Sequence, residues 1–347
     1  MPLSMRSWSL NTYCLSKIWY KTKSVPLGKC QISKIVSAIK KWIYQDLFIK
    51  PEEQILFRSR AAGGLGVMDV ASKSLAGMAR TFMETAANPE FSHRLDHSTM
   101  YEYHVLGNRD IPDPGYTPYY QEDFFALLRD IWEEKGSTVE KMNEKSWYGA
   151  IYARKNLEVI ADGERAPRPC RAERQDPGAD WEGRWPILNT RGLGPANTSF
   201  LIKMAHDLLP TTERLDNTKR NADITATGKC KVPECRGATD DREHSLFYCH
   251  TNNGVGERIL EGMRESIPGI TADDILKMKI ECNPEEKPSL VWLMTEALRT
   301  LWQAKMEKLT ITSEEIRTSV EANLTLLQET KLKSLAEGVG AIVANFF

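Results

Sequence analysis

The 347-residue sequence carries 46 Lys and Arg against 47 Asp and Glu, and 41% of it is hydrophobic. This length and apolar content suffice for two or more ordinary cores, and the net charge of −1 means that the chain as a whole is not an obvious polyanion binder. No run approaches the ~20 apolar residues of a membrane span, and the first residues lack the apolar stretch of a signal peptide. We therefore expect a soluble intracellular protein, nuclear and cytoplasmic, with no membrane partner.

Positive charge gathers near the N-terminus, where residues 15–60 contain ten Lys and Arg but three acidic residues. Within this stretch the apolar spacing predicts a helix over 31–48 with lysines opposite its apolar face. Clustered lysines release counterions when they bind a phosphate backbone, so a nucleic-acid surface is the functional interpretation. A plain amphipathic helix with a solvated lysine face is the alternative. The candidate phosphate contacts here are Lys34, Lys40 and Lys41.

A glycine cluster, Gly63-Gly-Leu-Gly66, precedes a second predicted helix that Asp69 or Ser72 could cap and Asn88-Pro89 would end. Such a cluster could cradle a phosphate. It lacks the Lys-Ser/Thr pair of a P-loop and the full dinucleotide-binding spacing. A tight turn with close backbone packing is the better interpretation.

The middle of the chain alternates turns with short helices. Residues 111–120 are rich in Pro and Gly and indicate a connection, and the apolar period predicts a short helix over 124–132. Residues 162–177 are polar and contain three prolines, which predicts an exposed linker. Trp181 and Trp185 are four residues apart and indicate a buried helical turn.

A further helix is predicted to begin at Asn197 as its N-cap and to end before Pro210. Its apolar face runs from Phe200 to Leu208. His206 falls off that face, so we expect it to face solvent.

Four residues within a twenty-residue window have the spacing of a metal site: Cys230, Cys235, His244 and Cys249. Zinc takes four thiolate or imidazole ligands in tetrahedral geometry, and four protein ligands leave no open position for catalysis. The seven cysteines at irregular spacing also favour a reducing compartment and metal binding over disulfides. The sequence predicts a structural Zn²⁺ site, although small buried residues would be the plainer explanation. Nearby Lys229, Lys231 and Arg236 are further candidate phosphate contacts.

The remainder is helical and acidic, with ten Lys and Arg against fourteen Asp and Glu from residue 261 onward. An apolar stripe over 290–302 indicates a core helix. Residues 313–332 form another amphipathic pattern, with Glu314 and Glu315 in the first turn, where the helix dipole favours them. The apolar tail, residues 341–347, could either dock or fray.

Taken together, these motifs resemble the C-terminal half of a LINE-type (non-LTR) retrotransposon reverse transcriptase. The most specific feature is Leu208-Leu-Pro-Thr-Thr-Glu-Arg-Leu215 followed by the Cys/His window. The resemblance implies a thumb over about residues 10–110 and a zinc-binding part over about 147–255. One departure is the first cysteine pair, separated by four residues where many relatives have two.

The catalytic element of that family is missing. Polymerase chemistry needs paired aspartates on a hairpin to hold two metal ions, in a Tyr/Phe-x-Asp-Asp context. Asp240-Asp241 lies inside the Cys/His window and Asp273-Asp274 opens a predicted helix, and neither follows the aromatic residue. The parent family is an RNA-directed DNA polymerase, but we do not expect this chain to be active alone.

The expected fold is mainly α, with a helical thumb-like region, a small Cys3His zinc-stabilised module and C-terminal helices. The expected function is binding of template RNA and target DNA, with the upstream polymerase domains of the same polyprotein as partners if they are expressed together. A truncated or domesticated copy that acts as a protein-interaction module is the alternative, and a non-functional remnant stays open. The expected segments are a thumb-like region (1–110), a connector (111–190), a zinc-binding module (191–260) and an acidic helical region (261–347).

Overall fold

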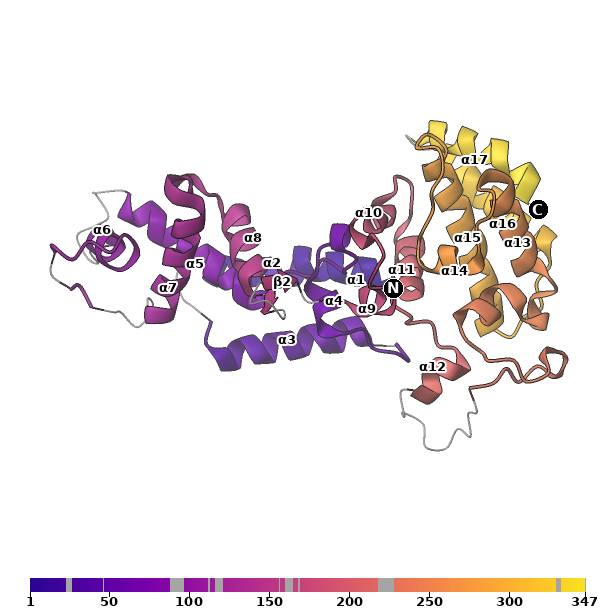
Figure 1. Cartoon of the computed structure of the whole chain (residues 1–347), viewed down its shortest axis with the longest axis horizontal. Coiled ribbons are helices and arrows are strands. Elements are labelled where there is room, and N and C mark those ends of the chain that lie inside the picture. Colours follow the sequence, from indigo (N-terminus) through magenta and orange to yellow (C-terminus); the bar gives the residue numbers. More distant parts are fainter. Residues whose placement is uncertain are drawn as a thin grey trace. The chain divides into compact units, whose positions relative to one another are not determined.

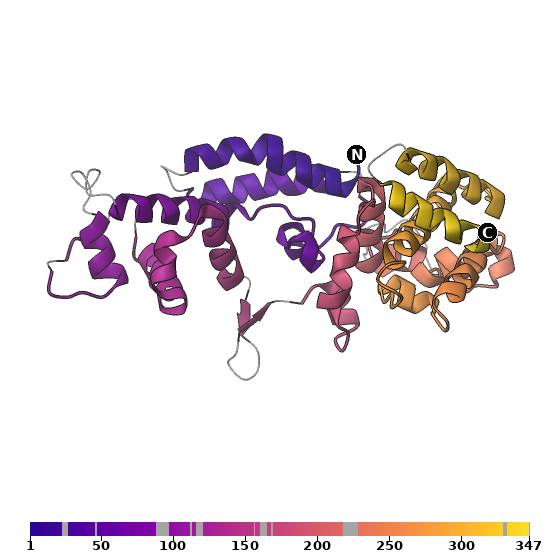
Figure 2. The ribbon, with the colours of Figure 1, turned by 90° about the horizontal axis from the view of Figure 1, so that it is seen from above.

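Helices account for nearly all of the regular structure in the computed structural model of the chain (Figure 1), so the predicted mainly α fold is confirmed. In the described part of the chain, the only sheet consists of two antiparallel strands of three residues each (Figure 2). Strands this short carry no readable two-residue alternation, which is why the sequence did not predict them. The structure describes residues 1–22, 27–45, 47–87, 97–111, 113–115, 121–155, 157–159, 165–167, 169–217, 228–328 and 332–346.

The chain folds into two compact units, each made of segments that are discontinuous in sequence. We call residues 8–43 and 67–168 the N-terminal unit. Residues 1–7, 44–66 and 169–347 form the C-terminal unit.

These units cut across the four consecutive segments expected from the sequence. The expected thumb-like segment, 1–110, contributes to both units, whereas the expected segments 191–260 and 261–347 fall together in the C-terminal unit. The functional names given to the segments remain predictions.

The N-terminal unit is built around helix α5, which packs against α2 and α8. Asp69 is its N-cap, as predicted, and accepts a hydrogen bond from the Ser72 amide at 2.8 Å. Phe82 on the inner face meets Phe124 and Phe125 edge to face, with ring centroids 5.8 and 5.5 Å apart. The elements of this unit are η1 (Leu10–Leu15), α2 (Ser16–Thr22), α3 (Lys29–Tyr44, whose last residue belongs to the other unit), α5 (Val70–Ala86), α6 (His97–Met100), η4 (Tyr101–Val105), α7 (Glu122–Lys135), η5 (Gly136–Lys141), α8 (Glu144–Lys155), β1 (Leu157–Val159) and β2 (Arg165–Pro167).

The C-terminal unit is built around α15, which contacts α11, α13, α16 and α17 (Figure 1). Contact on several sides explains why the predicted apolar stripe over 290–302 is buried. The tail docks through α17, where Val339 and Val343 are buried. The elements are α1 (Leu3–Ser9, whose last two residues belong to the other unit), α4 (Glu53–Phe57), η2 (Arg60–Ala62), α9 (Arg171–Gln175), α10 (Trp181–Arg184), η6 (Trp185–Asn189), α11 (Pro195–Ala205), α12 (Thr212–Asn217), η7 (Pro233–Cys235), η8 (His244–Tyr248), η9 (His250–Asn252), α13 (Val255–Ser266), α14 (Ala272–Leu276), α15 (Lys287–Met306), α16 (Ser313–Gln328) and α17 (Lys333–Phe346).

The glycine cluster is a tight turn, as its sequence favoured. Gly63 ends η2 with φ 77° and ψ 11°, and a Cβ built there would lie 2.5 Å from the ring of Trp185. Trp185 stacks on Trp181 on one side and on His206 on the other. The His206 imidazole also contacts the turn directly: its Nε2 lies 2.7 Å from the Gly63 carbonyl oxygen. The turn therefore packs directly against the buried tryptophans.

Three expectations for this unit are wrong, each because a partner distant in sequence changes the environment. His206 is fully buried beside Trp185 and does not face solvent. Gly194 is the N-cap of α11, and Asn197 lies inside that helix, where it donates to Glu296 and accepts from Arg299.

The third wrong expectation is the exposed linker over 162–177. In its described part, Cys170 is completely buried and α9 follows it. Two charged residues of α9 form partly buried ion pairs: Glu173 with Arg58 at 2.7 Å and Arg171 with Asp207 at 2.7 Å. Arg174 is exposed and pairs with Glu52. Over the described residues 169–177, the expectation of an exposed linker fails where the chain forms α9 and pairs its charges, and it holds at Pro169 and Pro177, which are exposed.

We expect Gly63→Ala to lower the free energy of unfolding by about 3 kcal/mol, because the new methyl group meets Trp185 in a left-handed backbone. Gly254→Ala is the matched control: its backbone is nearly the same (φ 71°, ψ 5°), but the nearest atom to its Cβ is 4.0 Å away. The control should lose about 1 kcal/mol. Equal losses in denaturant unfolding would contradict the packing of Trp185 on the turn.

His206 should make stability depend on pH. Burial lowers its pKa from 6.5 to about 4, so between these values the unfolded chain binds a proton that the folded chain does not. The free energy of unfolding therefore falls as the pH falls through this window, by up to about 3 kcal/mol. His206→Gln should flatten this slope, whereas Trp185→Phe, which keeps the histidine, should lower stability and retain it. Parallel slopes for wild type and His206→Gln would count against this account.

Candidate metal centre

Cys230 and Cys235 lie on either side of a tight reversal of the chain. The Cys230 amide donates to the Ala238 carbonyl at 2.7 Å, and the Ala238 amide donates to the Cys235 carbonyl at 3.0 Å. Pro233 begins the 3₁₀ turn η7, where its fixed φ suits the first helical position. Arg236 and Gly237 then take left-handed conformations, with φ 49° and 74°. The four residues between the cysteines thus form a closed loop that directs both sulfurs inward.

His244 begins the π-helical turn η8 and Cys249 directly follows its last residue. The Asp241 carboxylate accepts a hydrogen bond from the His244 amide at 2.7 Å and so fixes the start of the turn. Cys249 follows in extended backbone. The wider π-helical turn accommodates the five-residue spacing that one turn of α-helix would not.

The four ligand atoms lie within 4.8 Å of one another, so the structure brings together all four predicted ligands. The Cys249 sulfur is 3.8 Å from that of Cys230 and 3.9 Å from that of Cys235. A disulfide would need about 2.05 Å. Two thiolates bound at about 2.3 Å to one tetrahedral ion would be about 3.8 Å apart, which matches the observed spacing.

The polar atoms of the site also fit a metal. Nε2 of His244 is buried and makes no hydrogen bond with any described residue. Burial and the positive charge of Lys305 lower the pKa of His244, which favours the neutral imidazole that a metal requires. Burial opposes ionisation of Cys249, but hydrogen bonds from Thr251 outweigh it and lower the pKa of this thiol. The cluster could therefore hold a metal ion, and three sulfurs with one nitrogen would fill a tetrahedral site completely.

Asp240 connects this site to two other parts of the C-terminal unit. Its carboxylate accepts hydrogen bonds from the Thr212 amide at 2.9 Å and from the Thr212 hydroxyl at 2.6 Å. It also accepts from Ser245 and lies 3.3 Å from Nζ of Lys305 on α15. Burial alone would raise its pKa, but the hydrogen bonds from Ser245 and Thr212 hold it at about 2. Asp240 is therefore ionised at neutral pH and serves to hold Thr212, Ser245 and Lys305 together.

The sequence analysis considered Asp240 only as a catalytic aspartate, which it excluded, and did not predict its structural role. The signal that could have revealed its role is the hydroxyl pair in Leu208-Leu-Pro-Thr-Thr, since hydroxyls ahead of a short helix bind carboxylates readily. Thr212, the second of these, is the residue that binds it. The motif and the Cys/His window therefore form one connected structure.

Helix α13 supports the turn that carries His244. A Cβ on Gly256 would lie 2.1 Å from the carbonyl oxygen of Leu246, so the helix backbone packs directly on η8. The Asn252 side chain donates to the carbonyls of Ser245 and Leu246 at 2.9 and 3.2 Å. These contacts position the histidine independently of any ion.

A cavity of about 260 Å³ opens beside the cysteines. Three lysines and one carboxylate line it, and Lys305 already pairs with that carboxylate, Asp240. Lys231 and Lys308 therefore leave the cavity positively charged. The lining residues are Thr212, Cys230, Lys231, Val232, Asp240, Cys249, Thr251, Lys305, Lys308, Leu309 and Thr310.

The six candidate phosphate contacts fall into two groups. Lys34, Lys40 and Lys41 lie on α3 in the N-terminal unit, where Lys40 is half-buried and the other two are exposed. Lys229, Lys231 and Arg236 are exposed on residues 228–240, the segment around Cys230 and Cys235 that we call the metal loop, and of these Lys231 lines the cavity. Lys305 and Lys308, which the sequence assigned to an acidic region, join the second group at the cavity.

No protein-family profile, characterised protein or solved structure matches the chain. In the part that the structure describes, no helix is both long and apolar enough to cross a membrane.

Cys235→Ser should abolish metal binding and unfold the cysteine loop, residues 228–240, because structural metal sites of this kind contribute on the order of 10 kcal/mol to folding. Elemental analysis of the purified chain and hydrogen exchange over these residues measure the two effects. Cys282→Ser is the control, since that cysteine lies outside the cluster. Unchanged metal content and unchanged protection in Cys235→Ser would show that the four residues do not form a metal site.

Proposed function

We propose that this chain is the nucleic-acid-binding thumb and zinc-binding portion of a LINE-type retrotransposon reverse transcriptase, with Zn²⁺ at Cys230, Cys235, His244 and Cys249. The observation that carries the proposal is the arrangement of exposed cations on and beside the metal loop. Lys229, Lys231 and Arg236 project from the loop, and Lys308 lies across the adjoining cavity. Soft thiolate ligands with one imidazole suit zinc best among the common divalent ions.

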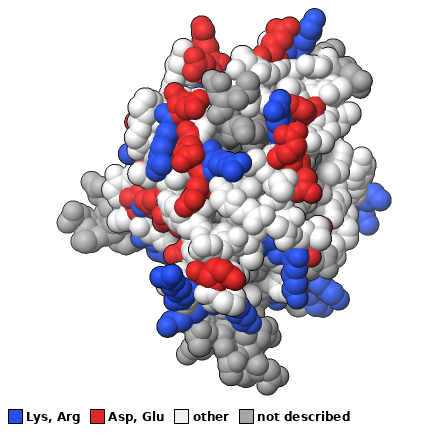
Figure 3. Space-filling model, turned by 90° about the vertical axis from the view of Figure 1, so that its right-hand side faces the viewer, with Lys and Arg blue, Asp and Glu red and all other residues white. Residues whose placement is uncertain are grey.

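The charge distribution on this part of the molecule supports the proposal. On the face shown in Figure 3, Lys and Arg gather toward the lower part, while Asp and Glu lie mostly in the upper part with basic residues among them. A rigid loop that presents cations next to a filled metal site would hold a phosphate backbone in place without reading its sequence.

In this proposal the chain positions nucleic acid and performs no chemistry. Asp240 is committed to Thr212, Ser245 and Lys305, so it is not available to hold catalytic metal ions. Asp274 caps its own helix through Thr271. Polymerisation would come from upstream domains of the same polyprotein, and the ligands would be template RNA and target DNA, in the nucleus and the cytoplasm.

Binding of structured RNA and duplex DNA, measured at several salt concentrations, tests the proposal. We expect the affinity of the wild-type chain to fall steeply with salt. The double variant Lys231→Gln/Lys308→Gln should bind about tenfold more weakly, with a log–log salt slope smaller by about two. Lys279→Gln, an equal change of charge at a lysine paired with Asp274, should have little effect.

Absence of binding at moderate salt would overturn the proposal. It would favour the alternative, a domesticated copy whose C-terminal helices bind a protein partner.

A further inference from the structure

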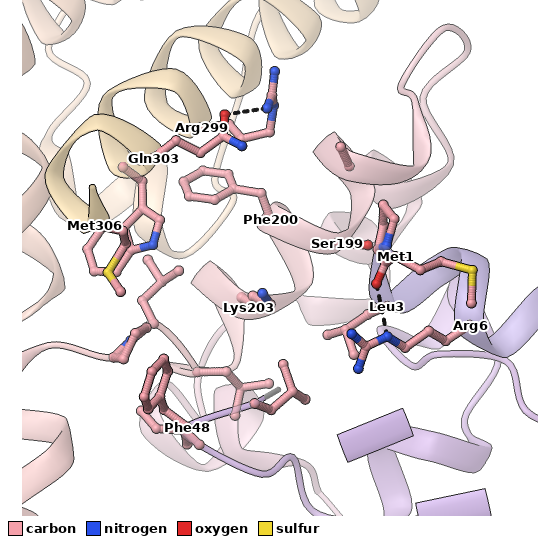
Figure 4. Close-up of a pocket in the computed structure, with 18 residues that line it drawn as sticks. Met1, Leu3, Arg6, Phe48, Ser199, Phe200, Lys203, Arg299, Gln303 and Met306 are labelled. Atoms are coloured by element: carbon pink, nitrogen blue, oxygen red, sulfur yellow. Dashed lines mark hydrogen bonds between the residues drawn. The ribbon is translucent and has the colours of Figure 1, made fainter. Parts of the chain in front are cut away.

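A second cavity, of about 310 Å³, lies within the C-terminal unit and touches neither the metal ligands nor their loop (Figure 4). It is formed by the start of the chain, the segment before α4, helix α11 and the end of α15. Its volume is at the lower end of the range for small-molecule sites. The lining residues are Met1, Pro2, Leu3, Arg6, Leu47, Phe48, Ile49, Ala196, Ser199, Phe200, Lys203, Leu208, Leu209, Pro210, Arg299, Trp302, Gln303 and Met306.

One part of the lining is aromatic, and Phe48 is its accessible ring. Phe48 leaves 64% of its surface exposed, although it is a large apolar side chain at the mouth of a cavity. Figure 4 shows Lys203 in the middle of the lining, with Phe200 on one side of it and Phe48 on the other. Trp302 adds a third ring to the wall; it and Phe200 are buried, at 8% and 4% exposed, so the exposed ring is that of Phe48. Exposed aromatic surface of this kind is typical of a binding site.

The other part of the lining is cationic. Lys203 forms no ion pair and no side-chain hydrogen bond with any described residue. Burial, together with the positive charge of Arg6, lowers the pKa of Lys203, so an anion bound beside it would relieve an unfavourable environment. Arg299, by contrast, already bonds Glu296, Asn197 and Gln303.

No acidic side chain is among the described residues that line this cavity. A ligand must therefore offer a negative group to Lys203 and a flat apolar group to the rings. A nucleotide has both, because its phosphate is an anion and its base stacks on aromatic side chains.

We propose that this cavity binds one unstacked nucleotide of a single strand, with the base stacked on Phe48 and the phosphate at Lys203. This inference rests on the proposed nucleic-acid function. It adds a nucleotide-binding site that is open only to an unpaired base. It predicts that the chain distinguishes single strands from duplexes at residues remote from the metal loop.

The test compares binding of a labelled twelve-nucleotide oligouridylate and of a duplex of equal length to the full chain. Phe48→Ala should weaken single-strand binding about tenfold, because stacking on an aromatic ring contributes strongly for each base, and should leave the salt slope unchanged. Lys203→Gln should weaken it about fivefold and lower the salt slope by about one. Neither variant should change binding of the duplex. Leu326→Ala removes an apolar side chain that is 60% exposed on α16, away from this cavity and from the candidate phosphate contacts, and serves as the control.

The outcomes separate this inference from the proposed function. Variants that bind the single strand as wild type does overturn the nucleotide site, while the effect of Lys231→Gln/Lys308→Gln would still support the function. If the wild type binds neither the single strand nor the duplex, the proposed function fails. Calorimetry with uridine monophosphate then tests whether the cavity binds a nucleotide. Binding of the monophosphate that Lys203→Gln removes supports the site, and no binding by the wild type overturns it.

Discussion

The cysteine side of the metal loop has few hydrophobic neighbours, so a metal ion bound there would be its main source of stability. Among the described residues, the hydrophobic side chains that pack on the three cysteines are those of Val232 and Ala238, both partly buried. At about 25 cal/mol per Å² such small side chains contribute little, whereas a structural metal contributes on the order of 10 kcal/mol. Metal binding would therefore fix the positions of Lys231, Thr251 and the cavity wall beside them. The Asp240 carboxylate connects this loop to Thr212 by hydrogen bonds and to α15 by its ion pair with Lys305.

Sequence reasoning succeeded where the determining contacts are local. The four ligands lie within twenty residues, so spacing alone predicted the cluster, and Asp69 caps α5 through a residue three positions away. It failed where the partner is remote. Asn197 is held by Glu296, ninety-nine residues away, and His206 is buried by a turn 143 residues earlier. No local pattern carries such information, because a polar side chain looks the same in sequence whether water or a buried carboxylate satisfies it.

The structure also separates cations that serve the fold from those that face solvent. Arg171, Arg214 and Arg242 converge on the single carboxylate of Asp207, itself in a left-handed conformation with φ 53°. Desolvation lowers the pKa of Arg242, and its ion pair with Asp207 opposes this effect. These arginines are committed to one buried anion. Composition cannot distinguish them from Lys229 or Lys231, which the structure leaves exposed to solvent.

The close approach of α13 to the turn that carries His244 restricts which residues a homologue could have at position 256. With a Cβ at position 256 only 2.1 Å from a backbone carbonyl, no other amino acid fits without moving the helix. A diverged homologue could exchange every surface lysine and most apolar side chains, but it should keep glycine there. It should also keep an acidic residue at position 240, opposite a hydroxyl at 212. These positions, read together with the four metal ligands, form an evolutionary signature that would outlast overall sequence similarity.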